Sequence, residues 1–122
     1  MSRFSDIVSH SKEHVQEQDV NEVHSRLESK EEFKLVDVRE DREWIAAHIT
    51  GATHIGKGVL ERDIEEAAPD LHTPIVLYCG GGVRSILAAD SLQRMGYTHV
   101  VSMSGGFAGW KNAGLPVTTG DA

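Results

Sequence analysis

Cysteine, proline and aromatic residues are scarce in this chain of 122 residues, and long apolar runs are absent. Its single cysteine excludes an intrachain disulfide, and neither a CxxC pair nor a cluster with metal-ligand spacing accompanies it. No segment approaches the roughly 18 continuous apolar residues that a membrane-spanning helix needs. The N-terminus also lacks the apolar stretch of a secretory signal. We therefore expect a protein of the reducing cytoplasm, with no metal, no cofactor and no membrane partner.

Basic residues are the minority among the charged ones. Twelve lysines and arginines stand against 19 aspartates and glutamates, which gives a formal net charge of −7 with neutral histidines. Such an acidic chain has no general electrostatic reason to bind nucleic acid or anionic lipid, so neither is expected as a partner. The 39% of apolar residues and the length suit one folded domain of ordinary size.

Short apolar strands alternate with helical segments along the chain. The residue patterns predict strands at 34–39, 53–55, 75–79 and 99–103, and helices at 20–27, 41–48, 60–68 and 83–95. The first of these helices has the clearest start, because Asp19 and Glu22 have the spacing of a capping box. This alternation is typical of an α/β fold in which helices cover both faces of a parallel sheet.

The most informative segment joins the most apolar strand to a helix through three glycines, and it begins with Cys79. In open parallel sheets, ligands bind beyond the carboxyl ends of the strands, which is where Cys79 is expected. A glycine-rich loop allows several N–H groups to face one concavity, and the helix that follows adds its positive dipole end. Both effects favour a reactive thiolate, so Cys79 is the candidate nucleophile. The candidate anion-binding residues are Gly80, Gly81, Gly82, Val83, Arg84 and Ser85.

A lone cysteine at the end of an apolar strand is more often a small buried hydrophobe than a nucleophile. Two features of this loop oppose that interpretation. Three glycines are entropically costly, and a merely structural cysteine gains nothing from them. Arg84 would also stand in the first turn of a helix, where a cation is unfavourable unless an anion is bound beside it.

Four motifs occur in order along the chain: residues 35–39 (LVDVR), 48–55 (HITGATHI), 78–85 (YCGGGVRS) and 104–110 (SGGFAGW), followed by Leu115-Pro-Val117. Together they resemble the motifs of the single-domain rhodaneses, which are persulfide-forming sulfurtransferases. The chain departs from the family pattern at Ala47 and Thr50, where glycine and proline are common, and both lie in an expected turn. The resemblance implies a rhodanese-like three-layer fold over residues 15–118, with a parallel sheet of about five strands. A polar N-terminal segment, residues 1–14, that could form a helix and a short tail, residues 119–122, lie outside it.

The resemblance implies sulfur transfer through a Cys79 persulfide. The thiolate would take the outer sulfur of thiosulfate, mercaptopyruvate or a low-molecular-weight persulfide, and the loop N–H groups would hold the anionic product. Cyanide or a thiol, including a protein thiol, would then accept the sulfur, because the chain has no second cysteine. Arg84 would hold the charged donor or stabilise the departing sulfite or thiolate. Two alternatives stay open: a rhodanese-like module that binds or regulates without turnover, and a single-cysteine redox sensor.

Loop length argues against a phosphatase. Four residues separate Cys79 from Arg84, whereas the related dual-specificity phosphatases have five residues between cysteine and arginine. The position that the longer register would require to be arginine is Ser85.

Asp37 and Arg39 are two apart at the end of a strand, so their side chains share one face. They are candidate supporting residues that either buttress the loop or add charge to its rim. Alternatively, Arg39 pairs with Glu43 across the start of a helix. His48 is expected to make local hydrogen bonds rather than to bind metal.

Overall fold

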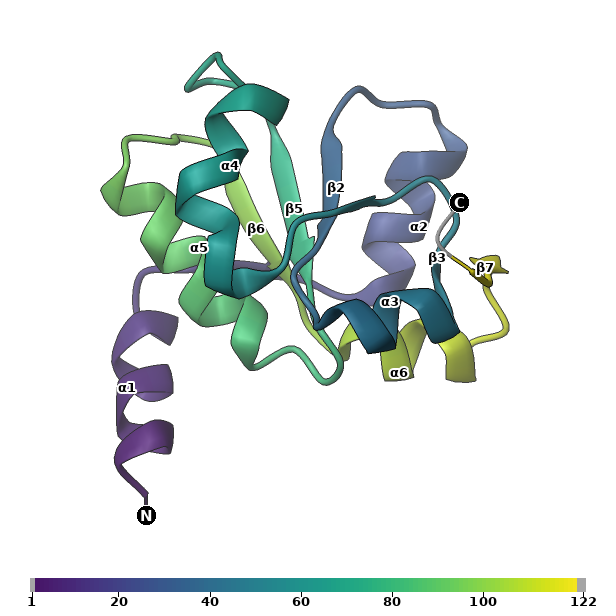
Figure 1. The fold of residues 1–122 in the computed structure, drawn as a ribbon, viewed down its shortest axis with the longest axis horizontal. Helices are drawn as coiled ribbons and strands as arrows, with labels where there is room; N and C mark the ends of the chain where they lie inside the picture. Colours follow the sequence, from purple (N-terminus) through teal and green to yellow (C-terminus); the bar gives the residue numbers. More distant parts are fainter. Residues whose placement is uncertain (1, 121–122) are drawn as a thin grey trace.

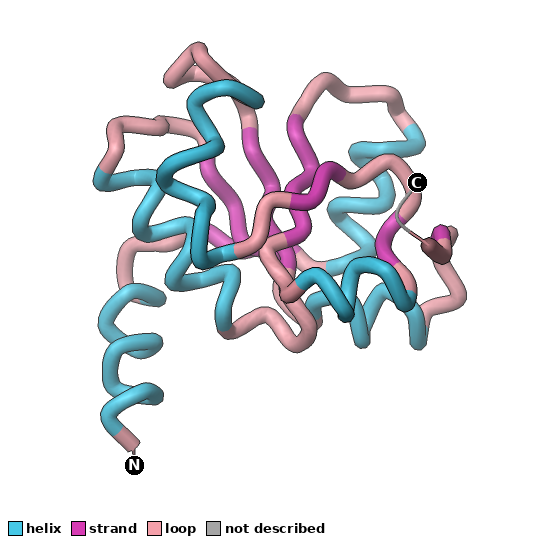
Figure 2. Tube along the Cα trace, viewed as in Figure 1, coloured by secondary structure: helices cyan, strands magenta, loops and turns pink. Residues whose placement is uncertain are grey.

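A computed structural model of the chain describes residues 2–120 (Figure 1). Five parallel strands form the central sheet in the order β1-β6-β5-β2-β4. They are β1 (Gln16–Gln18), β2 (Lys34–Asp37), β4 (Thr53–His54), β5 (Ile75–Tyr78) and β6 (Val100–Met103). Helices flank both sides of this sheet, as Figure 2 shows, so the predicted three-layer α/β fold is confirmed. Residues 121–122 of the expected tail lie outside the described part.

Two hydrophobic cores form because successive strand residues point to opposite faces. On one face, α4 (Leu60–Ala67) and α5 (Arg84–Arg94) cover a core that includes Leu77 and Cys79. On the other, α2 (Val20–Glu28) and α6 (Gly106–Asn112) cover a core that includes Val76 and Tyr78. Cys79 therefore lies on the same side of the sheet as α5, the helix that follows it.

The capping box predicted at the start of α2 is present. The Asp19 carboxylate accepts the Glu22 N–H at 2.9 Å, and the Glu22 carboxylate accepts the Asp19 N–H at 3.0 Å. Val23, on the apolar stripe of this helix, is fully buried. The sequence pattern thus located this helix correctly.

The helix predicted over residues 41–48 is too long. The observed helix, α3 (Asp41–Ala46), ends because Ala47 is extended and the next two residues form β3 (His48–Ile49). This short strand pairs antiparallel with β7 (Val117–Thr118), which lies far away in the sequence. The Tyr78 hydroxyl also accepts the Ile49 N–H at 3.0 Å, so tertiary contacts override the local helical tendency.

The N-terminal helix, α1 (Arg3–Lys12), packs against α5 and otherwise projects from the body of the domain (Figure 1). Its attachment is both apolar and polar. Val8 packs against the hydrophobic core, while Asp90 of α5 accepts the Ser11 hydroxyl at 2.7 Å and lies 2.8 Å from the His14 ring. A single 3-10 turn, η1 (Lys57–Val59), leads into α4. None of the helices described is both long and apolar enough to span a membrane.

Candidate active site

Cys79 follows β5 directly, at the carboxyl end of the central parallel strands, and its side chain is buried. The chain then curls through Gly80–Val83 before α5 begins at Arg84. This curl requires glycine at position 82, where φ is +92° and an added Cβ would approach the backbone of Gly105 within 3.1 Å. The loop after Cys79 therefore curves back, so that its later residues approach the Cys79 sulfur.

The loop directs hydrogen-bond donors at the cysteine sulfur. The Gly82 and Ser85 N–H groups lie 3.1 and 3.4 Å from Sγ, and the Ser85 hydroxyl lies 3.6 Å from it. Burial alone would raise the pKa of the Cys79 thiol, but the Ser85 hydroxyl and the Ser85, Gly82 and Gly81 N–H groups outweigh burial, so its pKa is lowered. The site favours a thiolate that is shielded from solvent.

Ser85→Ala is expected to raise the pKa of Cys79, because the variant loses the side-chain donor that contributes most to the lowering. The rate of alkylation by iodoacetamide should therefore rise with pH at a higher midpoint and be severalfold slower at neutral pH. The matched control is Ser102→Ala, which removes the 2.8 Å partner of Ser85 but leaves the Ser85 hydroxyl beside the sulfur. A midpoint that stays in place in Ser85→Ala would contradict this role.

The start of α6 holds the other side of the loop. The Phe107 N–H donates to the Cys79 carbonyl at 2.7 Å, and the Ala108 N–H donates to the Gly80 carbonyl at 3.0 Å. This approach depends on Gly106, where an added Cβ would stand 2.6 Å from both carbonyl oxygens. No residue of this segment is among the site residues predicted from the sequence.

Gly106→Ala is expected to destabilise the protein by about 2–4 kcal/mol and to displace the cysteine loop. The cost combines a φ of +57° with a backbone clash that no side-chain rotation relieves. Gly114→Ala is the matched control, because Gly114 has a φ of +73° but open space around it, so it carries the backbone strain alone. Urea denaturation measures both, and equal losses in the two variants would contradict the clash.

Asp37 and Arg39 form a buried ion pair behind the loop. Arg39 Nη2 lies 2.8 Å from Asp37 Oδ2, Nε is 3.1 Å from both carboxylate oxygens, and the two residues are 0% and 4% exposed. The Arg39 guanidinium also stacks over Phe107 at 4.3 Å. Phe107 in turn donates to the Cys79 carbonyl, so the buried pair contacts a residue that holds the loop and does not lie on an exposed rim.

The alternative pairing of Arg39 with Glu43 is wrong, because Glu43 pairs with Arg84 instead. The two Arg84 terminal nitrogens each lie 3.1 Å from a Glu43 carboxylate oxygen. The hydrogen bond from Arg84, strengthened by its charge, holds the pKa of Glu43 at about 2, well below the usual range. Glu43 is the site residue that the sequence analysis missed, since nothing local links α3 to a loop about 40 residues later.

The histidines near this site make local contacts. His48 Nδ1 lies 2.9 Å from the Trp44 carbonyl, and the two rings stack at 3.4 Å. His54 Nε2 lies 2.9 Å from the Arg39 carbonyl. Across residues 2–120, no three histidine, cysteine or carboxylate side chains come together in a way that could hold a metal ion.

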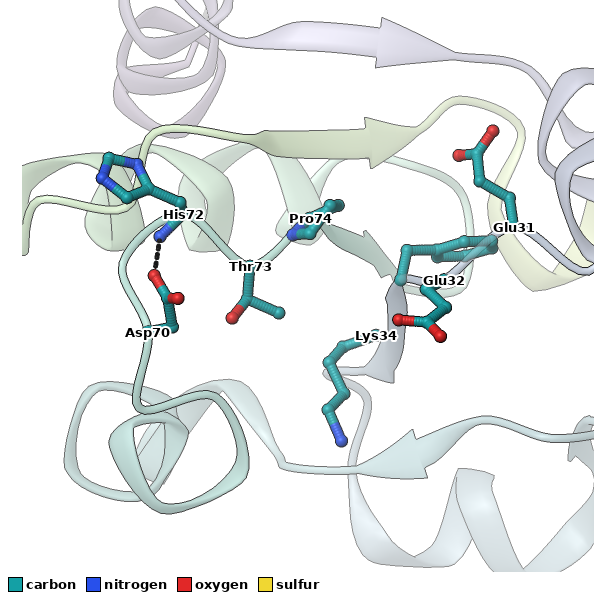
Figure 3. A pocket seen from close by; sticks show the side chains of 8 residues that line it. Glu31, Glu32, Lys34, Asp70, His72, Thr73 and Pro74 are labelled. Atoms are coloured by element: carbon teal, nitrogen blue, oxygen red, sulfur yellow. Dashed lines mark hydrogen bonds between the residues drawn. The ribbon is translucent and has the colours of Figure 1, made fainter.

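A surface hollow of about 500 Å³ lies at the opposite end of the sheet, where β2 and β5 begin (Figure 3). Its lining is mixed in charge: Glu31, Glu32, Phe33, Lys34, Asp70, His72, Thr73 and Pro74. The four residues of β5 separate it from Cys79 by roughly 13 Å. This hollow is therefore distinct from the cysteine site.

Comparisons with known proteins agree with the fold. The family described as the rhodanese-like domain matches residues 19–113. A thiosulfate sulfurtransferase GlpE of Haemophilus influenzae is 41% identical over 86 residues, which cover 70% of this chain and 79% of that protein. The GlpE of Vibrio cholerae is 33% identical over 99 residues, or 81% and 91% of the two chains.

Solved structures share the fold of this chain. A Rhodopseudomonas palustris protein of unknown function, described as a possible tyrosine phosphatase, superposes with a TM-score of 0.85 at 27% identity over 97% of this chain and 96% of that one. A rhodanese-like domain from Anabaena gives a TM-score of 0.76 at 28% identity over 84% and 78% of the two chains. With its cysteine loop at the sheet edge and most of its length matched, this chain belongs to the rhodanese-like domain family.

Proposed function

We propose that this protein is a sulfurtransferase that carries a sulfane sulfur as a persulfide on Cys79. The observation that supports this most strongly is the sulfur itself, which is buried yet receives hydrogen bonds from Gly82 and Ser85. A buried thiol without such donors would stay protonated and inert. The names of the relatives, thiosulfate sulfurtransferases, agree with the proposal.

In the first half-reaction, the Cys79 thiolate attacks the outer sulfur of thiosulfate. A sulfur–sulfur bond forms to Cys79 as the donor's own sulfur–sulfur bond breaks, and sulfite leaves with the electron pair. The product is a Cys79 persulfide anion, which the loop N–H groups and the start of α5 stabilise. A small persulfide would donate in the same way, by cleavage of its sulfur–sulfur bond and loss of a thiolate. Mercaptopyruvate would donate by cleavage of its carbon–sulfur bond, and the leaving pyruvate enolate would take up a proton to give pyruvate.

In the second half-reaction, cyanide or a thiolate attacks the outer sulfur of the persulfide, and Cys79 leaves as the thiolate. The acceptor comes from outside because Cys79 is the only cysteine of the chain. Arg84, paired with Glu43, stands beside the loop that the donor approaches, while Asp37 and Arg39 act as positioning residues through Phe107. A thiol that must stay reduced between turnovers suits the cytoplasm.

The proposal is tested by initial rates with thiosulfate and cyanide, followed by release of thiocyanate. Two half-reactions on one nucleophile predict parallel double-reciprocal lines when both substrates are varied. Intersecting lines would contradict a mechanism in which the Cys79 persulfide forms, and sulfite leaves, before the acceptor binds. No thiocyanate from thiosulfate, mercaptopyruvate or glutathione persulfide would favour a non-turnover binding module instead.

The redox-sensor alternative rests on the same lowered pKa, because a thiolate also reacts with peroxide. The two functions differ in the product on Cys79, which is an added sulfur atom in a sulfurtransferase and an oxidised sulfur in a redox sensor. Oxidation of Cys79 by peroxide without sulfur uptake from any donor would favour the sensor.

A further inference from the structure

The Arg84–Glu43 ion pair covers the first residue of the cysteine loop. An added Cβ on Gly80 would stand 3.1 Å from Arg84 Nη2 and 3.9 Å from Glu43 Oε2, so both charged groups lie against this glycine. Their side chains are 36% and 29% exposed, which places them at the solvent side of the loop. A donor that approaches the buried sulfur along this side meets the two charges together.

Glu43 is held in this position by its own helix. The Glu40 N–H at the start of α3 donates to Glu43 Oε1 at 3.0 Å, while the two Arg84 terminal nitrogens engage both carboxylate oxygens. A carboxylate fixed from two sides keeps the guanidinium from turning freely toward a ligand. At assay pH the glutamate is ionised, because its pKa lies at about 2.

We propose that Glu43 is a specificity-determining residue: it sets the net charge of the sulfur donor that the cysteine loop prefers. By neutralising Arg84, Glu43 leaves the loop with N–H donors but without net positive charge. It therefore selects against a dianionic donor such as thiosulfate and in favour of donors that carry less negative charge. This inference rests on the proposed sulfurtransferase function and names the donor class that the site prefers.

The test compares thiosulfate with methanethiosulfonate, in which a methyl group replaces one oxygen and lowers the charge from two to one. The leaving group is sulfite from thiosulfate and methanesulfinate from methanethiosulfonate, so a sulfur–sulfur bond breaks in both cases. In Glu43→Gln, the ratio of kcat/KM for thiosulfate to that for methanethiosulfonate should rise roughly fivefold, mainly through a lower KM for thiosulfate. An unchanged ratio would overturn the inference.

Two further variants are controls. One tests whether removing any negative charge from this helix has the same effect, and the other tests whether a different side chain at position 43 has the same effect while the carboxylate is kept. Asp41→Asn removes the same charge from the same helix at a side chain that is 93% exposed, and its ratio should stay within about twofold of the wild type. Glu43→Asp keeps a carboxylate at the mouth and should stay closer to the wild type than Glu43→Gln. A similar rise in Asp41→Asn, or a full rise in Glu43→Asp, would overturn the role of Glu43.

A second measurement needs no sulfur transfer. Iodoacetate and iodoacetamide alkylate the same sulfur and differ in charge, and Glu43→Gln should raise the rate of the anionic reagent relative to the neutral one severalfold. If alkylation shows this selection but no variant takes up sulfur, the proposed function fails while the charge selection stands. If sulfur is taken up and neither ratio moves, the inference fails alone.

Discussion

Cys79→Ser is expected to abolish thiocyanate formation, by more than about a thousandfold, while the protein stays folded. Serine cannot replace the nucleophile, because its hydroxyl stays protonated at neutral pH and forms no persulfide. It can, however, accept the Gly82 and Ser85 N–H groups that now point at the sulfur. The chain offers no second cysteine to take over the reaction.

The measurement is the rate of thiocyanate release from thiosulfate and cyanide, with urea denaturation as the check on folding. We expect the unfolding midpoint of Cys79→Ser to stay close to that of the wild type, because the substitution nearly conserves volume. Residual turnover above a tenth of the wild-type rate would mean that Cys79 is not the nucleophile.

Asp37→Asn is expected to cost about 3–5 kcal/mol of the free energy of unfolding. The variant leaves the Arg39 guanidinium almost fully buried without its counter-charge. The amide oxygen that replaces the carboxylate and the Ala47 carbonyl, 2.6 Å from Nη2, remain only as neutral acceptors. Typical domains have a total stability of about 5–15 kcal/mol, so this loss is large. We also expect slower sulfur transfer, since Arg39 stacks on the residue that donates to the Cys79 carbonyl.

Urea denaturation measures this loss, provided that the dependence of the free energy of unfolding on urea concentration is the same in the variant and the wild type. The control is Asp63→Asn, which breaks the surface ion pair with Arg62 at 2.7 Å, whose side chains are 38% and 75% exposed, and should leave the midpoint nearly unchanged. The double variant Asp37→Asn/Arg39→Met removes both buried charges and should recover part of the stability. A double variant less stable than Asp37→Asn would contradict an uncompensated charge as the cause.

Much of the fold was predictable because its signals are local. The apolar run of β5, the glycines that follow Cys79 and the Asp19 cap of α2 each carry their structure within a few residues. The same holds for the cysteine loop, where residue type and position along the strand suffice to identify the candidate nucleophile.

The remaining elements depend on contacts between distant segments. β1 consists of Gln16, Glu17 and Gln18, so it has no apolar pattern, and only its backbone pairing with β6 makes it a strand. β3 exists because residues 48–49 meet residues 117–118. A two-residue ladder of this kind leaves no periodicity to detect.

The Arg84–Glu43 pair at the site also depends on a contact between distant segments, which the local sequence does not predict. Arg84 stands in the first turn of α5, and its charge suggested a bound anion, whereas the structure supplies a carboxylate of the protein itself. An unfavourable cation at a helix start can thus be compensated from within the chain. Which residue compensates it follows only from the sheet order, which places β2, and therefore the start of α3, beside β5.

The most direct test of the account is the intact mass of the protein after incubation with thiosulfate and removal of the excess. We expect one added sulfur atom per wild-type chain, none on Cys79→Ser, and loss of the added sulfur when cyanide is supplied, with one thiocyanate released. A wild-type mass that stays unchanged with thiosulfate, mercaptopyruvate and glutathione persulfide would contradict the Cys79 persulfide.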